Sequence, residues 1–213
     1  MGKEDDIKRL AESVGHDWRE TPYYDEAEPH APFFWNPAGP VRPLFDRLPA
    51  GMMLDLACGA GRHVARLLEF AEKLIATDIN PENIQRCRER FEGERRLTLR
   101  VGNGYDFKPL KKESVSAIVS YDSMVHFDPD VVRSYLFDTP RVLAPGGMAL
   151  FHHSNYSAAP TAEYYGDNPG ARNFMSKELF AHWAAKSGMR VLEQVTFEWD
   201  HEPDLDCVTL LQK

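Results

Sequence analysis

The sequence has few cysteines and no cysteine pair. Cys58, Cys87 and Cys207 are the only three, and they form no Cys-x-x-Cys motif. An odd, scattered set argues against a disulfide framework and against a zinc site. It predicts a protein of the reducing cytoplasm.

Long apolar runs and an excess of positive charge are also absent. No run approaches the roughly 20 residues of a membrane-spanning helix, and the charged start of the chain argues against a secretory signal. With 25 basic and 33 acidic residues, the net charge is −8. Such a chain lacks the positive surface of a nucleic-acid-binding protein. We therefore expect neither a membrane nor a nucleic acid as partner.

What is present is the composition of a globular protein, with an unusual N-terminal segment. The 213 residues are 43% hydrophobic and 27% charged, enough for one buried core. Seven of the 15 prolines and six aromatic residues between Trp18 and Trp35 lie in the first 50 residues. Residues 1–50 are therefore expected to form an irregular or helical arm, either a packed leader or a lid over an active site. Residues 51–213 are expected to form the main domain.

Strands and helices alternate after residue 50. Apolar runs and turn residues predict strands at 52–57, 74–77, 97–101, 115–121, 148–153, 191–199 and 207–211. Helices are predicted at 62–71, 81–92, 129–143 and 177–187, with an interruption or kink at Pro140 and a turn at 144–147. The alternation predicts an α/β fold. Its doubly wound, seven-stranded sheet is mostly parallel, with the last strand antiparallel and helices on both faces.

The loop after the first strand contains two closely spaced glycines, Gly59 and Gly61. They allow a tight turn and a close approach to a ligand. Asp78 ends the next strand, where a carboxylate can accept both hydroxyls of a ribose. Val64 stands where a dinucleotide site would have a third glycine, and no phosphate-binding Lys-Ser/Thr pair follows. The pattern favours an adenosine ligand without a pyrophosphate.

Residues 52–151 resemble the class I, Rossmann-like methyltransferases that depend on S-adenosylmethionine, of the small-molecule type. The family's first loop reads (D/E)-x-G-x-G-x-G, and residues 55–61 here read DLACGAG, with Ala57 in place of the first glycine. The resemblance implies S-adenosylmethionine as cofactor. It assigns the methionine part to this loop, the ribose to Asp78 and its neighbours, and the adenine to Asn103, unless Asn103 bonds its own backbone. The implied cofactor residues are Asp55, Ala57, Cys58, Gly59, Gly61, Asp78, Ile79, Asn80, Asn103, Gly104, Tyr105 and Tyr121.

Methyl transfer is an in-line displacement that needs the acceptor atom roughly 3–3.5 Å from the methyl carbon. A hydroxyl acceptor must also lose its proton, which a histidine or carboxylate can take. His126, after the fourth strand, is the expected general base, and its alternative role is packing. Asp122 is the second candidate and could instead bond loop amides, and His153 is the third.

The segment 154–175 has no periodicity, and long irregular segments of this kind are usually functional. Its tyrosines and polar residues suit a hydroxyl-rich small molecule such as a saccharide. The expected substrate residues are Asn155, Tyr156, Arg172, Asn173, Tyr24 and Trp35. A surface ion pair is the alternative role of Arg172.

The leading hypothesis is O-methylation of a small polar acceptor. N-methylation of a small amine or amino sugar is the nearest alternative. A NAD-dependent dehydrogenase is disfavoured by Val64 and by the lack of a Tyr-x-x-x-Lys pair, and a non-catalytic cofactor-binding protein is the third class. The Asn/Asp-Pro-Pro motif of DNA-base methylation is missing. His152, His153 and Asp122 lack a ligand spacing, so no metal is expected.

Overall fold

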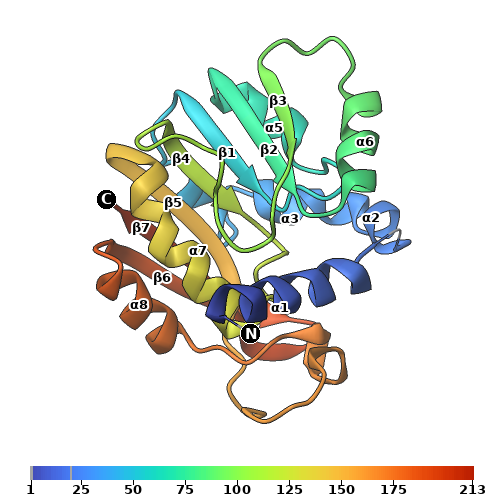
Figure 1. Ribbon diagram of the computed structural model, residues 1–213, viewed down its shortest axis with the longest axis vertical. Helices are drawn as coiled ribbons and strands as arrows, with labels where there is room; N and C mark the ends of the chain where they lie inside the picture. The colour runs from blue at the N-terminus through green and yellow to red at the C-terminus, as the bar shows by residue number, and fades with distance from the viewer. Residues whose placement is uncertain (1, 20) are drawn as a thin grey trace.

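A computed structural model describes residues 2–19 and 21–213 (Figure 1). Met1 and Glu20, both within the predicted arm, lie outside the described residues. The sheet has seven strands in the order β3-β2-β1-β4-β5-β7-β6. They are β1 (Met52–Leu56), β2 (Lys73–Asp78), β3 (Leu97–Val101), β4 (Val115–Ser120), β5 (Leu143–Ser154), β6 (Arg190–Trp199) and β7 (Glu202–Gln212). Strand β7 pairs antiparallel with β5 and β6, and the other pairs are parallel. The predicted fold class is confirmed.

Helices cover both faces of the sheet. They include α5 (Val64–Phe70), α6 (Pro81–Arg90), α7 (Pro129–Val142) and α8 (Lys177–Lys186). Neighbouring residues of β1 point to opposite faces. Leu54 belongs to one buried cluster with side chains of α7 and α8, whereas Met53 belongs to a second cluster with side chains of α5 and α6. The sheet is therefore the shared wall of two hydrophobic layers.

Two helices begin at the predicted residues, but one predicted break is absent. Helix α6 begins at Pro81, directly after Asn80. The Ser176 hydroxyl accepts the backbone N–H of Leu179 at the start of α8. The interruption predicted at Pro140 does not occur, because α7 continues to Val142. Pro140 lies in the last turn, where little of the helix depends on the hydrogen bond that it lacks.

Strand β5 begins earlier than predicted. The turn expected at 144–147 lies inside the strand, because Leu143 already pairs with Val115. The register shifts before Met148 pairs with Ala117. A bulged strand start therefore takes the place of a free turn.

The N-terminal arm is more helical than the prolines alone suggest. Helix α1 (Lys3–Asp17) precedes the first proline, and short helices follow: α2 (Tyr23–Glu26), η1 (Glu28–His30), α3 (Ala31–Trp35) and α4 (Arg42–Phe45). Helix α1 lies against the end of the sheet (Figure 1), where the Asn80 side chain donates to the Gly15 carbonyl at 2.9 Å. A Cβ at Gly15 would lie 2.8 Å from Ile79, so the approach needs glycine.

None of the helices formed by residues 2–19 and 21–213 is long and apolar enough to cross a membrane.

Candidate active site

A cavity lies at the carboxyl ends of β1, β2 and β4, and the N-terminal arm supplies part of its wall. Most of the predicted cofactor residues line it: Asp55, Ala57, Cys58, Gly59, Asp78, Ile79, Asn80, Gly104 and Tyr121. Three do not, namely Gly61, Asn103 and Tyr105. The strand ends thus converge on one site, as expected for a parallel sheet.

The glycine loop and Asp78 are joined directly. The Gly59 N–H donates to Asp78 Oδ2 at 2.9 Å, and Asp78 Oδ1 accepts from the Asn80 N–H at 2.9 Å. Gly59 has a φ of 54°, and a Cβ there would lie 2.7 Å from the ring of Tyr24. Glycine is therefore required both by the backbone conformation and by the close approach of the arm.

Two buried carboxylates give the cavity a negative wall. Burial and, to a smaller extent, the nearby Asp78 raise the pKa of Asp55 against the opposing charge of Arg62, to a net value of about 7. Burial also raises the pKa of Asp78, although its hydrogen bonds oppose that effect. A positively charged ligand would stabilise both ionised carboxylates.

Asn103 is occupied by its own loop. Its Nδ2 donates to Asp106 Oδ1 at 2.6 Å, and its Oδ1 accepts the backbone N–H groups of Tyr105 and Asp106 at 3.1 and 3.0 Å. Tyr105 points to α1 and donates to Glu4 at 3.3 Å. Asp106, rather than Asn103, lines the cavity.

His126 lines the cavity in a defined protonation state. Its Nδ1 lies 2.8 Å from the carbonyl oxygen of Ala171. Because a carbonyl only accepts, Nδ1 carries the proton and Nε2 is the acceptor nitrogen. Burial, followed by the charge of Arg172, lowers the pKa of His126 to about 4, so the ring is neutral at pH 7. The indole ring of Trp18 lies on it with a centroid distance of 4.3 Å.

Asp122 is the second candidate base in the cavity wall. Its Oδ2 accepts from the Tyr23 hydroxyl at 2.5 Å and from Arg62 Nη2 at 2.7 Å. Its Oδ1 is buried and has no partner among the described residues. Burial alone would raise the pKa of Asp122, but the positive charge of Arg62 and the hydrogen bonds from Tyr23 and Arg62 contribute to a larger combined effect that lowers the pKa. Asp122 is therefore an ionised group, held at one oxygen and unpaired at the other.

The predicted substrate residues of the segment 154–175 do not line the cavity. Arg172 is 2% exposed and forms a two-point ion pair with Asp206 at 2.8 and 2.6 Å. Asn155 and Asn173 bond neighbouring segments, through Asp204 O and His126 O respectively. The Tyr156 N–H donates to Ser154 Oγ at 3.0 Å. These residues hold the segment in place behind the wall.

The remaining predicted residues divide between the cavity and the core. Tyr24 lines the cavity, and its hydroxyl accepts from Asn83 at 2.8 Å. Trp35 lies outside the lining and donates from Nε1 to His63 Nδ1 at 3.2 Å. His153 is buried away from the cavity, with its ring stacked on Phe180 at 3.8 Å.

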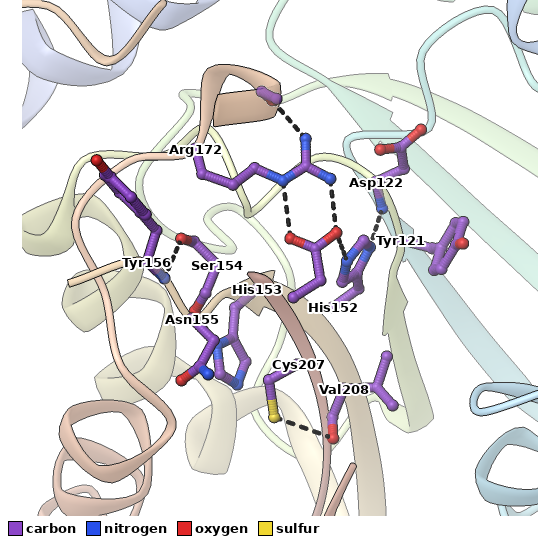
Figure 2. Close-up of polar contacts among 12 residues, drawn as sticks. Tyr121, Asp122, His152, His153, Ser154, Asn155, Tyr156, Arg172, Cys207 and Val208 are labelled. Carbon is purple, nitrogen blue, oxygen red and sulfur yellow. Dashed lines mark hydrogen bonds and ion pairs between the residues drawn. The ribbon is translucent and has the colours of Figure 1, made fainter. Parts of the chain in front are cut away.

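His152 lies outside the cavity lining and contacts Asp122, which is part of it (Figure 2). Its Nδ1 accepts the backbone N–H of Asp122 at 3.0 Å, and its Nε2 lies 2.9 Å from Asp206 Oδ2. Arg172 approaches the same carboxylate from its other side. Four polar groups thus form one buried chain that reaches the wall at Asp122.

The lining residues that sequence reasoning missed include Trp18, Tyr23, Arg62 and His63. Two features of the sequence point to these residues. Arg62 and His63 directly follow the glycine loop, and Trp18 and Tyr23 lie in the N-terminal arm, which is rich in aromatic residues. Within residues 2–19 and 21–213, no group of three or more His, Cys, Asp or Glu side chains could hold a metal ion.

Comparisons with known proteins agree with this geometry. Residues 53–147 match a family model described as a methyltransferase domain. No curated protein sequence matches. The matched segment contains the glycine loop, Asp78 and the end of β4, and so most of the cofactor-side wall.

Solved structures share the fold over most of the chain. A TehB-like S-adenosylmethionine-dependent methyltransferase from Corynebacterium glutamicum is 20% identical, with a TM-score of 0.61 over 91% of this chain and 100% of that one. An S-adenosylmethionine-dependent methyltransferase from Mesorhizobium loti is 16% identical, with a TM-score of 0.65 over 81% and 97%. A putative methyltransferase from Haloferax volcanii, in complex with the Trm112 methyltransferase activator, is 16% identical, with a TM-score of 0.69 over 93% and 96%.

Proposed function

We propose that this class I S-adenosylmethionine-dependent methyltransferase methylates a hydroxyl group of a small polar acceptor, with His126 as the general base. One observation carries the proposal. The Ala171 carbonyl holds the proton of His126 on Nδ1 and leaves Nε2 as the proton-accepting atom of a ring in the cavity wall.

The cavity suits the cofactor in shape and charge. S-adenosylmethionine, when bound, supplies an electrophilic methyl group on a positively charged sulfur. Asp78 accepts N–H groups of Gly59, Asn80 and Asn83, and the lone pair that remains on Oδ2 can accept a ribose hydroxyl. The ionised Asp55 would face the positive charge. The bare backbone at Gly59 leaves room for close contact, which a Cβ at that position would fill.

His126 is suited to take the acceptor's proton. Its pKa of about 4 keeps it neutral in the free enzyme across the physiological range. When Nε2 takes a proton, the Nδ1–H bond to Ala171 O becomes charge-assisted and stronger. A base placed in this way contributes about 10²–10⁴-fold to the rate.

The walls favour a small acceptor. Trp18 and Tyr23 bring aromatic surface from the arm, and Asp122 and Arg62 bring polar groups from the strand ends. An enclosed site of this kind suits a saccharide-like molecule better than a nucleic acid, in agreement with the net charge of −8. The three cysteines are free and buried, which supports a cytoplasmic enzyme.

N-methylation of a small amine or amino sugar is the second candidate. The unpaired Oδ1 of Asp122 favours it, because that oxygen could accept an N–H of the acceptor. An unprotonated amine also needs no base. The two candidates therefore differ in their dependence on His126.

Transfer of a labelled methyl group to a panel of sugars and a panel of amines tests the proposal. We expect His126→Ala to lower turnover of a hydroxyl acceptor by about 10²–10⁴-fold with little change in the KM for S-adenosylmethionine. His182→Ala, at an exposed histidine of α8, is the matched control and should leave turnover unchanged. Full hydroxyl turnover in His126→Ala would show that His126 is not the base, and turnover of amines alone would select the second candidate.

A further inference from the structure

We propose that Asp206, which lies outside the cavity lining, is a positioning residue that aligns His126 and Asp122 at the same time. Two arms of polar contacts leave its buried carboxylate, one through hydrogen bonds from Arg172 and one through a 2.9 Å contact with His152 Nε2. Each arm ends at one candidate catalytic group. The proposal rests on the proposed function, in which those two groups face the acceptor.

The first arm runs through Arg172. Asp206 holds the guanidinium by two hydrogen bonds, at 2.8 Å from Nε and 2.6 Å from Nη2, and Nη1 donates to the Gly170 carbonyl at 2.5 Å. Gly170 and Ala171 both have positive φ values, of 56° and 54°. Such a conformation is costly for alanine and persists only where the surroundings impose it. The anchored Arg172 is the neighbouring group that does so.

The strained residue carries the carbonyl that fixes the base. Ala171 O accepts from His126 Nδ1 at 2.8 Å. Asn173, two residues after Ala171, donates its backbone N–H to Val125 O at 2.9 Å and its side-chain Nδ2–H to His126 O at 3.3 Å. The segment therefore grips both the ring and the backbone of His126, and Arg172 anchors that grip to β7.

The second arm runs through His152 (Figure 2). His152 Nδ1 accepts the Asp122 N–H at 3.0 Å, so the proton of its neutral ring is on Nε2, which lies 2.9 Å from Asp206 Oδ2. Asp122 also has a positive φ, of 56°. Its backbone N–H is thus held in place at a strained position by a histidine whose orientation depends on Asp206.

The proposal requires a carboxylate at position 206, because a carboxylate only accepts hydrogen bonds and never donates them. Asp206 is fully buried, and all three contacts that reach it come from N–H donors. In Asp206→Asn one oxygen becomes an NH₂ group. In place of Oδ1 this group faces Arg172 Nε, and in place of Oδ2 it faces Arg172 Nη2 and His152 Nε2, so at least one contact is lost and its arm is weakened.

Nitrogen-15 NMR of labelled histidine tests the arms without any acceptor, because it reports which ring nitrogen carries the proton. In the wild-type protein with S-adenosylhomocysteine bound, we expect His126 as the Nδ1–H form and His152 as the Nε2–H form. A His152 ring protonated on Nδ1, or a His126 ring protonated on Nε2, would overturn the proposal. This measurement needs no variant, so it remains decisive if Asp206→Asn does not fold.

In Asp206→Asn we expect at least one of the two rings to leave its wild-type form, while the Kd for S-adenosylhomocysteine changes less than about twofold. The matched control is Thr209→Val, which removes a buried hydrogen bond to His153 from the same strand. It should leave both rings and the Kd unchanged. Unchanged rings in Asp206→Asn would refute the proposal, and so would a loss of cofactor binding, which would indicate a merely structural role.

Failure of this proposal can be distinguished from failure of the proposed function. Full turnover in His126→Ala would remove the base and leave the two arms intact in the NMR spectra. Unchanged rings in Asp206→Asn would remove the positioning role and leave the base in place.

Discussion

Binding of S-adenosylmethionine should weaken as the pH falls below 7, because Asp55 must lose a proton to face a positively charged ligand. Burial raises the pKa of Asp55 to about 7 in the free protein. About half of the molecules therefore carry an ionised Asp55 at pH 7, and about 3% do so at pH 5.5. If only the ionised form binds well, the Kd rises about 15-fold between these pH values, or about 1.6 kcal/mol.

Isothermal titration calorimetry at pH 5.5, 6, 6.5 and 7 measures this slope. His126 and His63, which also line the cavity, have pKa values of about 4 and about 3 and stay neutral over the window. Asp55→Asn should bind more weakly at pH 7 and should lose the slope. A Kd that is constant in the wild-type protein, or a slope that persists in Asp55→Asn, would refute the reasoning.

The same group should affect the stability of the free protein with the opposite sign. Asp55 binds its proton more tightly in the folded than in the unfolded state, because the folded pKa is raised. Its contribution to the free energy of unfolding is therefore complete below about pH 4 and is lost as the pH rises to 7. Asp55→Asn should flatten this part of the stability profile, measured by urea unfolding without ligand.

Three further predictions concern the cofactor loop and the arm. Gly59→Ala should weaken S-adenosylhomocysteine binding at least about tenfold, because the φ of Gly59 is 54° and the new Cβ would lie 2.7 Å from Tyr24. The control is Gly146→Ala, where φ is also positive, at 76°, but the space around the residue is open. In calorimetry this variant should bind S-adenosylhomocysteine normally. Trp18→Ala, which removes the ring stacked on the proposed base, should raise the KM of the acceptor more than that of the cofactor, and Phe137→Ala, at an exposed aromatic residue, should change neither. S-adenosylhomocysteine at 100 times its Kd should stabilise the protein by about 2.7 kcal/mol in thermal unfolding, while NAD should give no shift; the reverse result would select a dehydrogenase.

The alternation of strands and helices was predictable because each element has its own hydrophobic periodicity within a few consecutive residues. Each buried strand contains a short apolar run, and helix α8 begins directly after its capping residue, Ser176. S-adenosylmethionine as cofactor, predicted from the glycine loop, is confirmed by the match over residues 53–147. These features lie close together in the sequence.

The role of Arg172 was not predictable in the same way. Its partner Asp206 is 34 residues away, and only the pairing of β5 with β7 brings that carboxylate beneath the segment. The partners of Asn103, in contrast, are close in the sequence, since its side chain accepts backbone N–H groups of its own loop. A helical arm was among the expectations, but the bounds of helix α1 were not predicted, because the prolines that follow it dominated the interpretation of the arm.

The arm is fastened to the cavity at two points. Side chains from Ala11 to Ala27 form part of the cavity wall, and the bonds Asn80–Gly15 and Asn83–Tyr24 hold this stretch to the β2 side of the site. If a spent nucleoside leaves on this side, both bonds must first break. We then expect an arm that is bound more tightly to make a slower enzyme even with unchanged chemistry.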